Sequence, residues 1–105
     1  MILDEICAHK RVEVEARKRE VSRAQLEERL ETAWPPRDFR KALRMPGMSL
    51  IAEVKKASPA KGVLMADLDP VDVSGAYEQG GARAISVLTD ERYFHGSPDD
   101  LTTVR

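Results

Sequence analysis

The sequence contains few of the residues from which disulfides and metal sites are built. Its 105 residues include one cysteine and two histidines, and only 5% are aromatic. The single cysteine, Cys7, cannot form a disulfide within the chain, and its place on an apparent helix face predicts a small buried side chain rather than a reactive thiol. Neither His9 nor His95 has a second ligand at metal-site spacing, so no metal site is predicted.

The chain also lacks a strong charge bias and any long apolar run. Its 17 basic and 18 acidic side chains give a formal net charge of −1, whereas a general nucleic-acid surface shows a basic excess. No apolar stretch approaches the roughly 20 residues that span a bilayer. The acidic pair Asp4 and Glu5 stands where a secretory leader carries positive charge. We therefore expect a globular unit in the cytoplasm, with no nucleic-acid or membrane partner.

Residues 1–47 carry the patterns of helices. Apolar residues recur at helical spacing over residues 1–21, and the remaining face is charged, which predicts a helix with a solvated side. Glu13 with Arg17, and Glu15 with Arg19, stand in the favourable i,i+4 order. A second helix is expected to begin at the capping-box pair Ser22 and Gln25 and to end at Trp34-Pro35-Pro36. A helical turn follows at residues 39–43.

The period changes to that of a strand at Met48. Residues 49–55 alternate, with Glu53 and Lys55 on one face, and both faces are apolar until the carboxyl end, as in a parallel strand covered on two sides. Asp69-Pro70 marks a helix start, and Gly80-Gly81 marks its end. Residues 84–88 predict a second strand, and Ser97-Pro98 starts another helix. The order predicts an α/β fold with one βαβ crossover.

The carboxyl end of the first strand is the place where reactive groups are expected. Glu53 and Lys55 stand there two positions apart; a buried carboxylate and ammonium could form an acid–base pair or hold a charged substrate, or could be a structural ion pair. The segment Ser58–Gly62 could present a hydroxyl, backbone amides and a cation to an anion, or form a simple turn. After the second strand, Phe94 could line an apolar ligand face or pack under its own loop.

Two long segments give the sequence a family resemblance. Residues 50–62, LIAEVKKASPAKG, and residues 77–91 with Tyr93-Phe94 and Gly96-Ser97 resemble the first two strands and loops of indole-3-glycerol phosphate synthases. The opening Ile2–Ile6 is similar to the extra amino-terminal helix of that family. The resemblance implies the amino-terminal portion of a (β/α)8 TIM barrel, with a helical extension over residues 1–47. Residues 48–105 would then hold the first two βα units, the chain ending early in the second.

The resemblance also implies a reaction. The family closes the indole ring of 1-(2-carboxyphenylamino)-1-deoxyribulose 5-phosphate with loss of carbon dioxide and water, in tryptophan biosynthesis, without cofactor or metal. Glu53 matches a catalytic carboxylate that assists proton movement in ring closure or dehydration. Lys55 matches a catalytic lysine that pairs with the substrate carboxylate and transfers protons. Ser58 matches a residue near the substrate's anionic groups, and Phe94 an aromatic beside the anthranilate ring. Ala60 departs from the serine that many members carry.

The family's other catalytic groups are expected to lie outside these 105 residues. A complete barrel needs around 250 residues, and two parallel strands neither close a sheet nor cover its edges. The resemblance therefore implies an inactive fragment that pairs with the missing carboxyl-terminal part of the barrel. A self-associating module without catalysis is the alternative. A different phosphate-handling barrel, such as the isomerase of the same pathway, is disfavoured by Glu53-Val54-Lys55 and Tyr93-Phe94.

Overall fold

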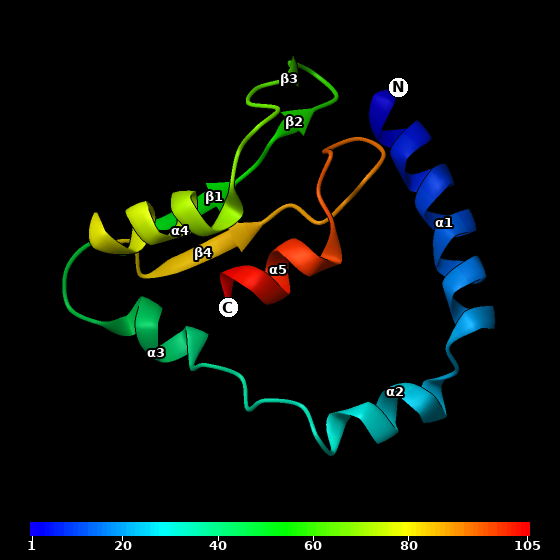
Figure 1. Cartoon of the computed structure of the whole chain (residues 1–105), viewed down its shortest axis with the longest axis horizontal. Helices are drawn as coiled ribbons and strands as arrows, with labels where there is room; N and C mark the ends of the chain where they lie inside the picture. The colour runs from blue at the N-terminus through cyan, green and yellow to red at the C-terminus, as the bar shows by residue number, and fades with distance from the viewer. The chain divides into compact units, whose positions relative to one another are not determined.

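The computed structural model describes all 105 residues, which form two compact units, residues 1–37 and 38–105. In the first unit, α1 spans Ile2–Glu20 and α2 spans Arg23–Leu30 (Figure 1). Both predicted helices are confirmed. The capping box is also confirmed, because the Gln25 amide donates to Ser22 Oγ at 3.2 Å and the Ser22 amide donates to Gln25 Oε1 at 2.7 Å. No helix of the chain has both the length and the apolarity needed to cross a membrane.

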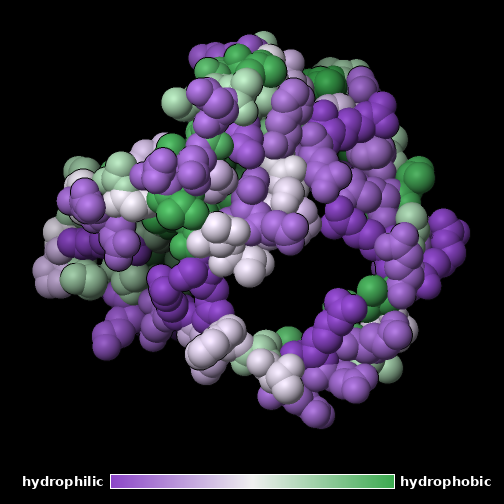
Figure 2. Space-filling view, in the orientation of Figure 1, coloured by the Kyte–Doolittle hydropathy of each residue, from purple (hydrophilic) through white to green (hydrophobic).

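Two predictions for the first unit are wrong. Helix α2 ends at Leu30, before Trp34-Pro35-Pro36, because the chain tightens there: the Glu31 amide bonds the Glu28 carbonyl three residues back, a 3₁₀ contact that closes helix ends. Cys7 is exposed rather than buried, since neither α1 nor α2 buries any residue. Figure 2 shows mostly hydrophilic side chains along both helices.

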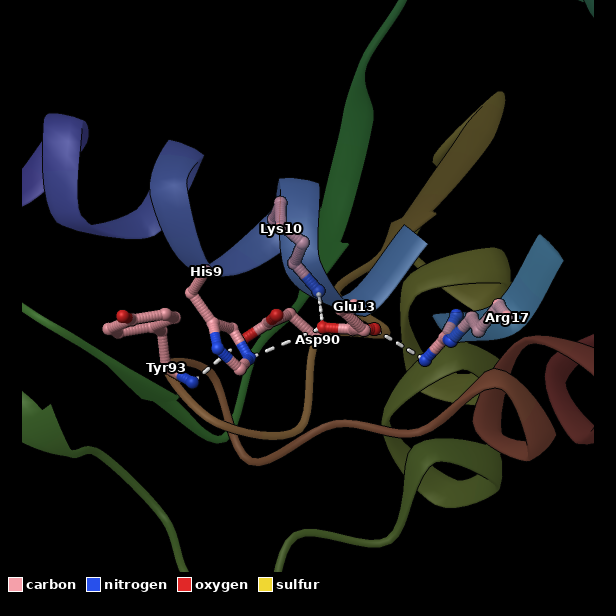
Figure 3. Close-up of polar contacts among 6 residues, drawn as sticks. All are labelled: His9, Lys10, Glu13, Arg17, Asp90 and Tyr93. Carbon is pink, nitrogen blue, oxygen red and sulfur yellow. Dashed lines mark hydrogen bonds and ion pairs between the residues drawn. The ribbon is translucent and has the colours of Figure 1, made fainter. Parts of the chain in front are cut away.

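Glu13 is the centre of an ion-pair network on α1 (Figure 3). Its carboxylate lies 2.6 Å from Arg17 Nη2, as the i,i+4 spacing predicts, and 2.9 Å from Lys10 Nζ. His9 Nε2 is 3.4 Å from the same carboxylate. The hydrogen bond from Lys10, with the positive charges of Lys10, Arg17 and His9, lowers the pKa of Glu13 below its usual 4.5. The predicted pair of Glu15 with Arg19 is replaced by a pair with Lys18, whose Nζ lies 3.1 Å from Glu15 Oε1.

The network makes a prediction about pH. Because the pKa of Glu13 is lower in the folded state, ionised Glu13 stabilises α1 above its usual pKa, and this contribution is lost as the pH falls through the lower folded value. We expect the helicity of the chain, measured by circular dichroism, to fall as the pH drops below the usual glutamate pKa of 4.5. The fall should be smaller in Glu13→Gln than in the matched control Glu20→Gln. Equal curves for the two variants would contradict the assignment.

The second unit carries the predicted βαβ crossover. Its main elements are α3 (Phe39–Arg44), β1 (Ile51–Val54), α4 (Pro70–Gln79), β4 (Ala84–Val87) and α5 (Pro98–Val104). The two helix-start patterns are confirmed, because Asp69 Oδ1 accepts from the Val71 amide at 2.9 Å and Ser97 Oγ accepts from the Asp99 amide at 3.0 Å. Strands β1 and β4 are adjacent and parallel. The α/β crossover is therefore present as predicted.

The sheet is covered mainly on one face. Register pairs Ala52 with Ile85 and Val54 with Val87, and α4 packs against β1, leaving Val54 only 3% exposed. On the opposite face Ile51 is 48% exposed. We call the face that carries Ile51, Glu53 and Lys55 the inner face of the sheet. The prediction that β1 is covered on two sides is wrong for this chain, because no comparable apolar layer packs against this inner face.

A short hairpin follows β1 and includes the segment Ser58–Gly62, which was expected to present groups to an anion or to form a simple turn. Strands β2 (Ala57–Ser58) and β3 (Gly62–Val63) pair antiparallel. The carbonyl of Lys56 accepts from the amides of Leu64 and Met65, at 2.8 and 3.1 Å, and closes the base of the hairpin. Ala57 is 2% exposed, so the hairpin is anchored at its first residue while its far end is open to solvent.

Arg83 joins the start of β4 to the connection between α3 and β1. Its Nη1 donates to the Met45 carbonyl at 2.6 Å and to Ser49 Oγ at 2.8 Å, and its Nη2 donates to the Pro46 carbonyl. Gly47, inside that connection, has a φ of 90°, a conformation that side chains with a Cβ rarely adopt. The guanidinium therefore holds a sharp turn against the amino end of the sheet.

Candidate active site

Glu53 and Lys55 lie together at the carboxyl end of β1. Lys55 Nζ is 3.5 Å from Glu53 Oε1, which confirms that the two side chains share a face, as the two-residue period requires. The expectation of a buried pair is wrong: the side chains of Glu53 and Lys55 are 47% and 35% exposed. They stand on the open inner face of the sheet, where solvent reaches both charges.

Ser86 is a third side chain at this place, and the sequence reasoning missed it. The hydroxyl of Ser86 donates to Glu53 Oε2 at 3.4 Å, a long hydrogen bond. Glu53 and Ser86 are register partners on β1 and β4, and register partners in a parallel pair point to the same face. The predicted second strand, residues 84–88, carried no signal for this contact, because the pairing of Ser86 with Glu53 depends on the register of the two strands.

Tyr77 supports Glu53 from the other side of the sheet. It belongs to α4, and its hydroxyl donates to the backbone carbonyl of Glu53 at 2.9 Å. This contact joins residues 24 positions apart and ties α4 to the end of β1. It fixes the backbone from which the Glu53 side chain projects.

Removing the Tyr77 hydroxyl should loosen this connection. We expect Tyr77→Phe to lower the free energy of unfolding by about 1 kcal/mol, the usual net value of one hydrogen bond between neutral groups. The aromatic ring stays in place, so the loss reports the hydroxyl alone. Urea denaturation followed by circular dichroism measures it, and an unchanged midpoint would show that the hydrogen bond contributes nothing.

Ser58 lies in the β2–β3 hairpin. Its Oγ accepts from the Lys61 amide at 3.2 Å, which is the turn that the sequence offered as the simpler interpretation. The neighbouring Lys56 is directed elsewhere, since its Nζ is 3.9 Å from Asp100 Oδ2 at the start of α5. Of the two consecutive lysines, only Lys55 therefore pairs with Glu53.

Phe94 is half-buried in a tight loop that follows β4, the strand beside β1. Asp90 Oδ2 accepts from the Tyr93 amide at 2.6 Å (Figure 3), and the Asp90 carbonyl accepts from the Gly96 amide at 2.8 Å. His95 has a φ of 54°, in the left-handed region. The loop is thus closed by its own backbone, and it follows the strand that pairs with the strand of Glu53.

The arrangement suits proton transfer next to an anionic group. A carboxylate can accept a proton, and an ammonium beside it can donate one or pair with a negative ligand. Nowhere in the chain do three or more histidine, cysteine, aspartate or glutamate side chains form a group that could hold a metal. The carboxylate of Glu53 and the ammonium of Lys55 make acid–base and electrostatic chemistry available at this place.

Comparison with known proteins gives one family. The family model described as indole-3-glycerol phosphate synthase matches residues 3–105. The indole-3-glycerol phosphate synthase of Mycolicibacterium gilvum (strain PYR-GCK) is 52% identical over 104 residues, which are 99% of this chain and 38% of that protein. Proteins of the same name from Roseiflexus sp. (strain RS-1) and Microcystis aeruginosa (strain NIES-843 / IAM M-2473) are 52% and 47% identical, again over 99% of this chain and over 39% and 36% of their own lengths. The chain spans less than two fifths of these relatives.

Proposed function

Because the chain belongs to the indole-3-glycerol phosphate synthase family, we propose that it supplies the first part of the enzyme that closes the indole ring in tryptophan biosynthesis. The substrate is 1-(2-carboxyphenylamino)-1-deoxyribulose 5-phosphate, and the reaction releases carbon dioxide and water. This makes the whole protein a carbon–carbon lyase that acts on a small phosphorylated molecule. The family match favours this reaction over that of the related isomerase.

The proposed architecture is a (β/α)8 barrel with an extra amino-terminal part. Residues 1–47 form the helical extension, and residues 48–105 form the first two βα units, in which β1 and β4 are barrel strands one and two. The parallel pairing of β1 with β4 and the α4 crossover support this assignment. The cytoplasmic location predicted from composition stays a prediction.

The observation that carries the proposed function is the Glu53–Lys55 pair, 3.5 Å apart at the carboxyl end of β1. Catalytic groups of such barrels gather at the carboxyl ends of the strands. We assign Lys55 to pairing with the substrate carboxylate and to proton transfer, and Glu53 to proton movement in ring closure or dehydration. Ring closure needs a proton at the ketone oxygen, and loss of the carboxylate restores aromaticity. No cofactor is needed for these steps.

Two further residues are assigned to substrate binding. Ser58, in the hairpin that follows β1, is assigned to the anionic groups of the substrate. Phe94, in the loop that follows β4, is assigned to the anthranilate ring, because an aromatic side chain offers a flat apolar contact. The two loops follow adjacent parallel strands. Both loops therefore begin at the carboxyl end of the sheet, as a shared binding site requires.

A chimera tests the proposed function. Residues 1–105 replace the matched segment of the Mycolicibacterium gilvum relative, whose remaining sequence completes the protein; we call this the synthase chimera. We expect the synthase chimera to form indole-3-glycerol phosphate, and the 105-residue chain alone to be inactive. A folded but inactive chimera would contradict the proposed function. Turnover by the chain alone would contradict the claim that the remaining barrel is required.

The chain alone is also proposed to associate, either with the rest of the barrel or with a second copy. Leu50 and Ile51 are 59% and 48% exposed, and the two-stranded sheet has an unpaired edge on each side. Such edges and apolar faces favour pairing with another chain. Light scattering at increasing concentration should therefore show a rising mass. A monomer at all concentrations would contradict self-association.

A further inference from the structure

We propose that Ser86 is a positioning residue that orients the Glu53 carboxylate for the ring-closure reaction. This inference rests on the proposed function. It starts from the two oxygens of Glu53, which have different partners: Oε1 faces Lys55 Nζ at 3.5 Å, and Oε2 accepts from the Ser86 hydroxyl at 3.4 Å. The partners come from different strands, so the carboxylate is restrained from two directions.

The restraint matters because the terminal torsion of glutamate is broad. The carboxylate group of a glutamate rotates with little preference when nothing holds it, and the side chain of Glu53 is 47% exposed. One contact to Lys55 leaves the carboxylate free to turn about that contact. A second contact to the other oxygen, from the neighbouring strand, defines its plane. Each carboxylate oxygen can accept more than one hydrogen bond, so Glu53 can still receive a substrate proton.

The position of Ser86 is set by the sheet itself. Ser86 is the register partner of Glu53, so its hydroxyl projects from the same face of the sheet, on a short side chain with a single rotatable bond to the hydroxyl oxygen. By comparison, Lys55 reaches Glu53 through a long flexible side chain. Ser86 is therefore the better fixed of the two partners and the one suited to set the geometry. A group misplaced by about 1 Å can cost about 10²-fold in rate.

The test compares two substitutions that differ only in a hydroxyl. Threonine and valine have nearly the same shape and both suit a strand, so Ser86→Thr keeps the donor and Ser86→Val removes it. In the synthase chimera we expect Ser86→Val to lower kcat roughly 10-fold relative to Ser86→Thr, in line with the loss of a hydrogen bond to a charged group. KM should stay nearly unchanged, because Ser86 is proposed to act through Glu53 and not to touch the substrate.

A Glu53→Gln background separates positioning from a general structural effect. With the carboxylate replaced, the difference in kcat between Ser86→Thr and Ser86→Val should disappear, since two residues that act through one contact are not additive. Circular dichroism and the melting temperature check that each variant is folded, and Ser86→Ala replaces the valine variant if that one is not.

Each result decides the inference. Equal kcat values for the threonine and valine variants would overturn it, as would a gap that persists in Glu53→Gln or a change confined to KM. These outcomes leave the proposed function intact, because the parent chimera is active in all of them. An inactive parent chimera would instead overturn the proposed function, and the positioning role of Ser86 with it.

Discussion

In the synthase chimera, Lys55→Ala is expected to lower kcat/KM by about 10²- to 10⁴-fold, the usual contribution of a well-placed acid–base group. The reason is the place of the ammonium: it lies 3.5 Å from Glu53 on the open inner face, at the carboxyl end of β1. Loss of Lys55 removes both the proposed partner of the substrate carboxylate and a proton donor. Steady-state kinetics with the synthase substrate measures the effect.

The chain offers a matched control in the next residue. Lys56 carries the same charge one position along, but its Nζ lies 3.9 Å from Asp100 at the start of α5. We therefore expect Lys56→Ala to change kcat/KM far less than Lys55→Ala, with its effect mainly on stability. If the two alanine variants lose activity equally, general loss of positive charge explains the result, and the assignment of Lys55 is wrong.

The second large effect is expected at Gly96. A Cβ at this position would lie 1.9 Å from the Leu88 carbonyl oxygen and 2.8 Å from the carbonyl carbon. Both atoms are backbone at the end of β4, so no side chain can move aside to make room. We expect Gly96→Ala to destabilise the protein by about 3 kcal/mol or more, at or beyond the upper range for overpacking, and to displace the loop that carries Phe94.

Gly75 provides the contrasting substitution. It lies inside α4, and a Cβ there would meet no atom within 4 Å. Alanine favours a helix interior over glycine by roughly 0.5–1 kcal/mol, so Gly75→Ala should raise the free energy of unfolding. Denaturant titration of both chimera variants gives the comparison. A Gly96→Ala protein as stable as its parent would show that the loop does not pack against Leu88 as described.

The local signals in the sequence predicted most of the elements. Asp69-Pro70 and Ser97-Pro98 placed two helix starts correctly, because a capping side chain and a proline act within a few residues of their own position. The hairpin of β2 and β3 was missed, since two-residue strands have no period to detect. The open inner face of β1 was also missed. The apolar residues of β1 show which side chains the strand could bury. Whether another helix or strand packs over them depends on segments that are distant in the sequence.

The candidate site was predictable only along one strand. Glu53 and Lys55 are two residues apart, so the strand period alone places them on one face. Ser86 and Tyr77 reach Glu53 from 33 and 24 residues away. Such contacts depend on the register of β1 against β4 and on the packing of α4, which neither period nor spacing defines. Glu53 and Lys55 are exposed because they project from the same uncovered face of β1 as Ile51.

The three hydrogen bonds of Arg83 have a consequence for strand alignment. The register of the two strands pairs Ile51 with Ala84 and Ala52 with Ile85. A slip of one residue would carry every side chain of β4 to the opposite face. It would also withdraw the guanidinium from Met45, Pro46 and Ser49. The hydrogen bonds of Arg83 therefore fix the register of β4 at the amino end of the sheet. The hydrogen bond from Ser86 to Glu53 at the carboxyl end depends on that register.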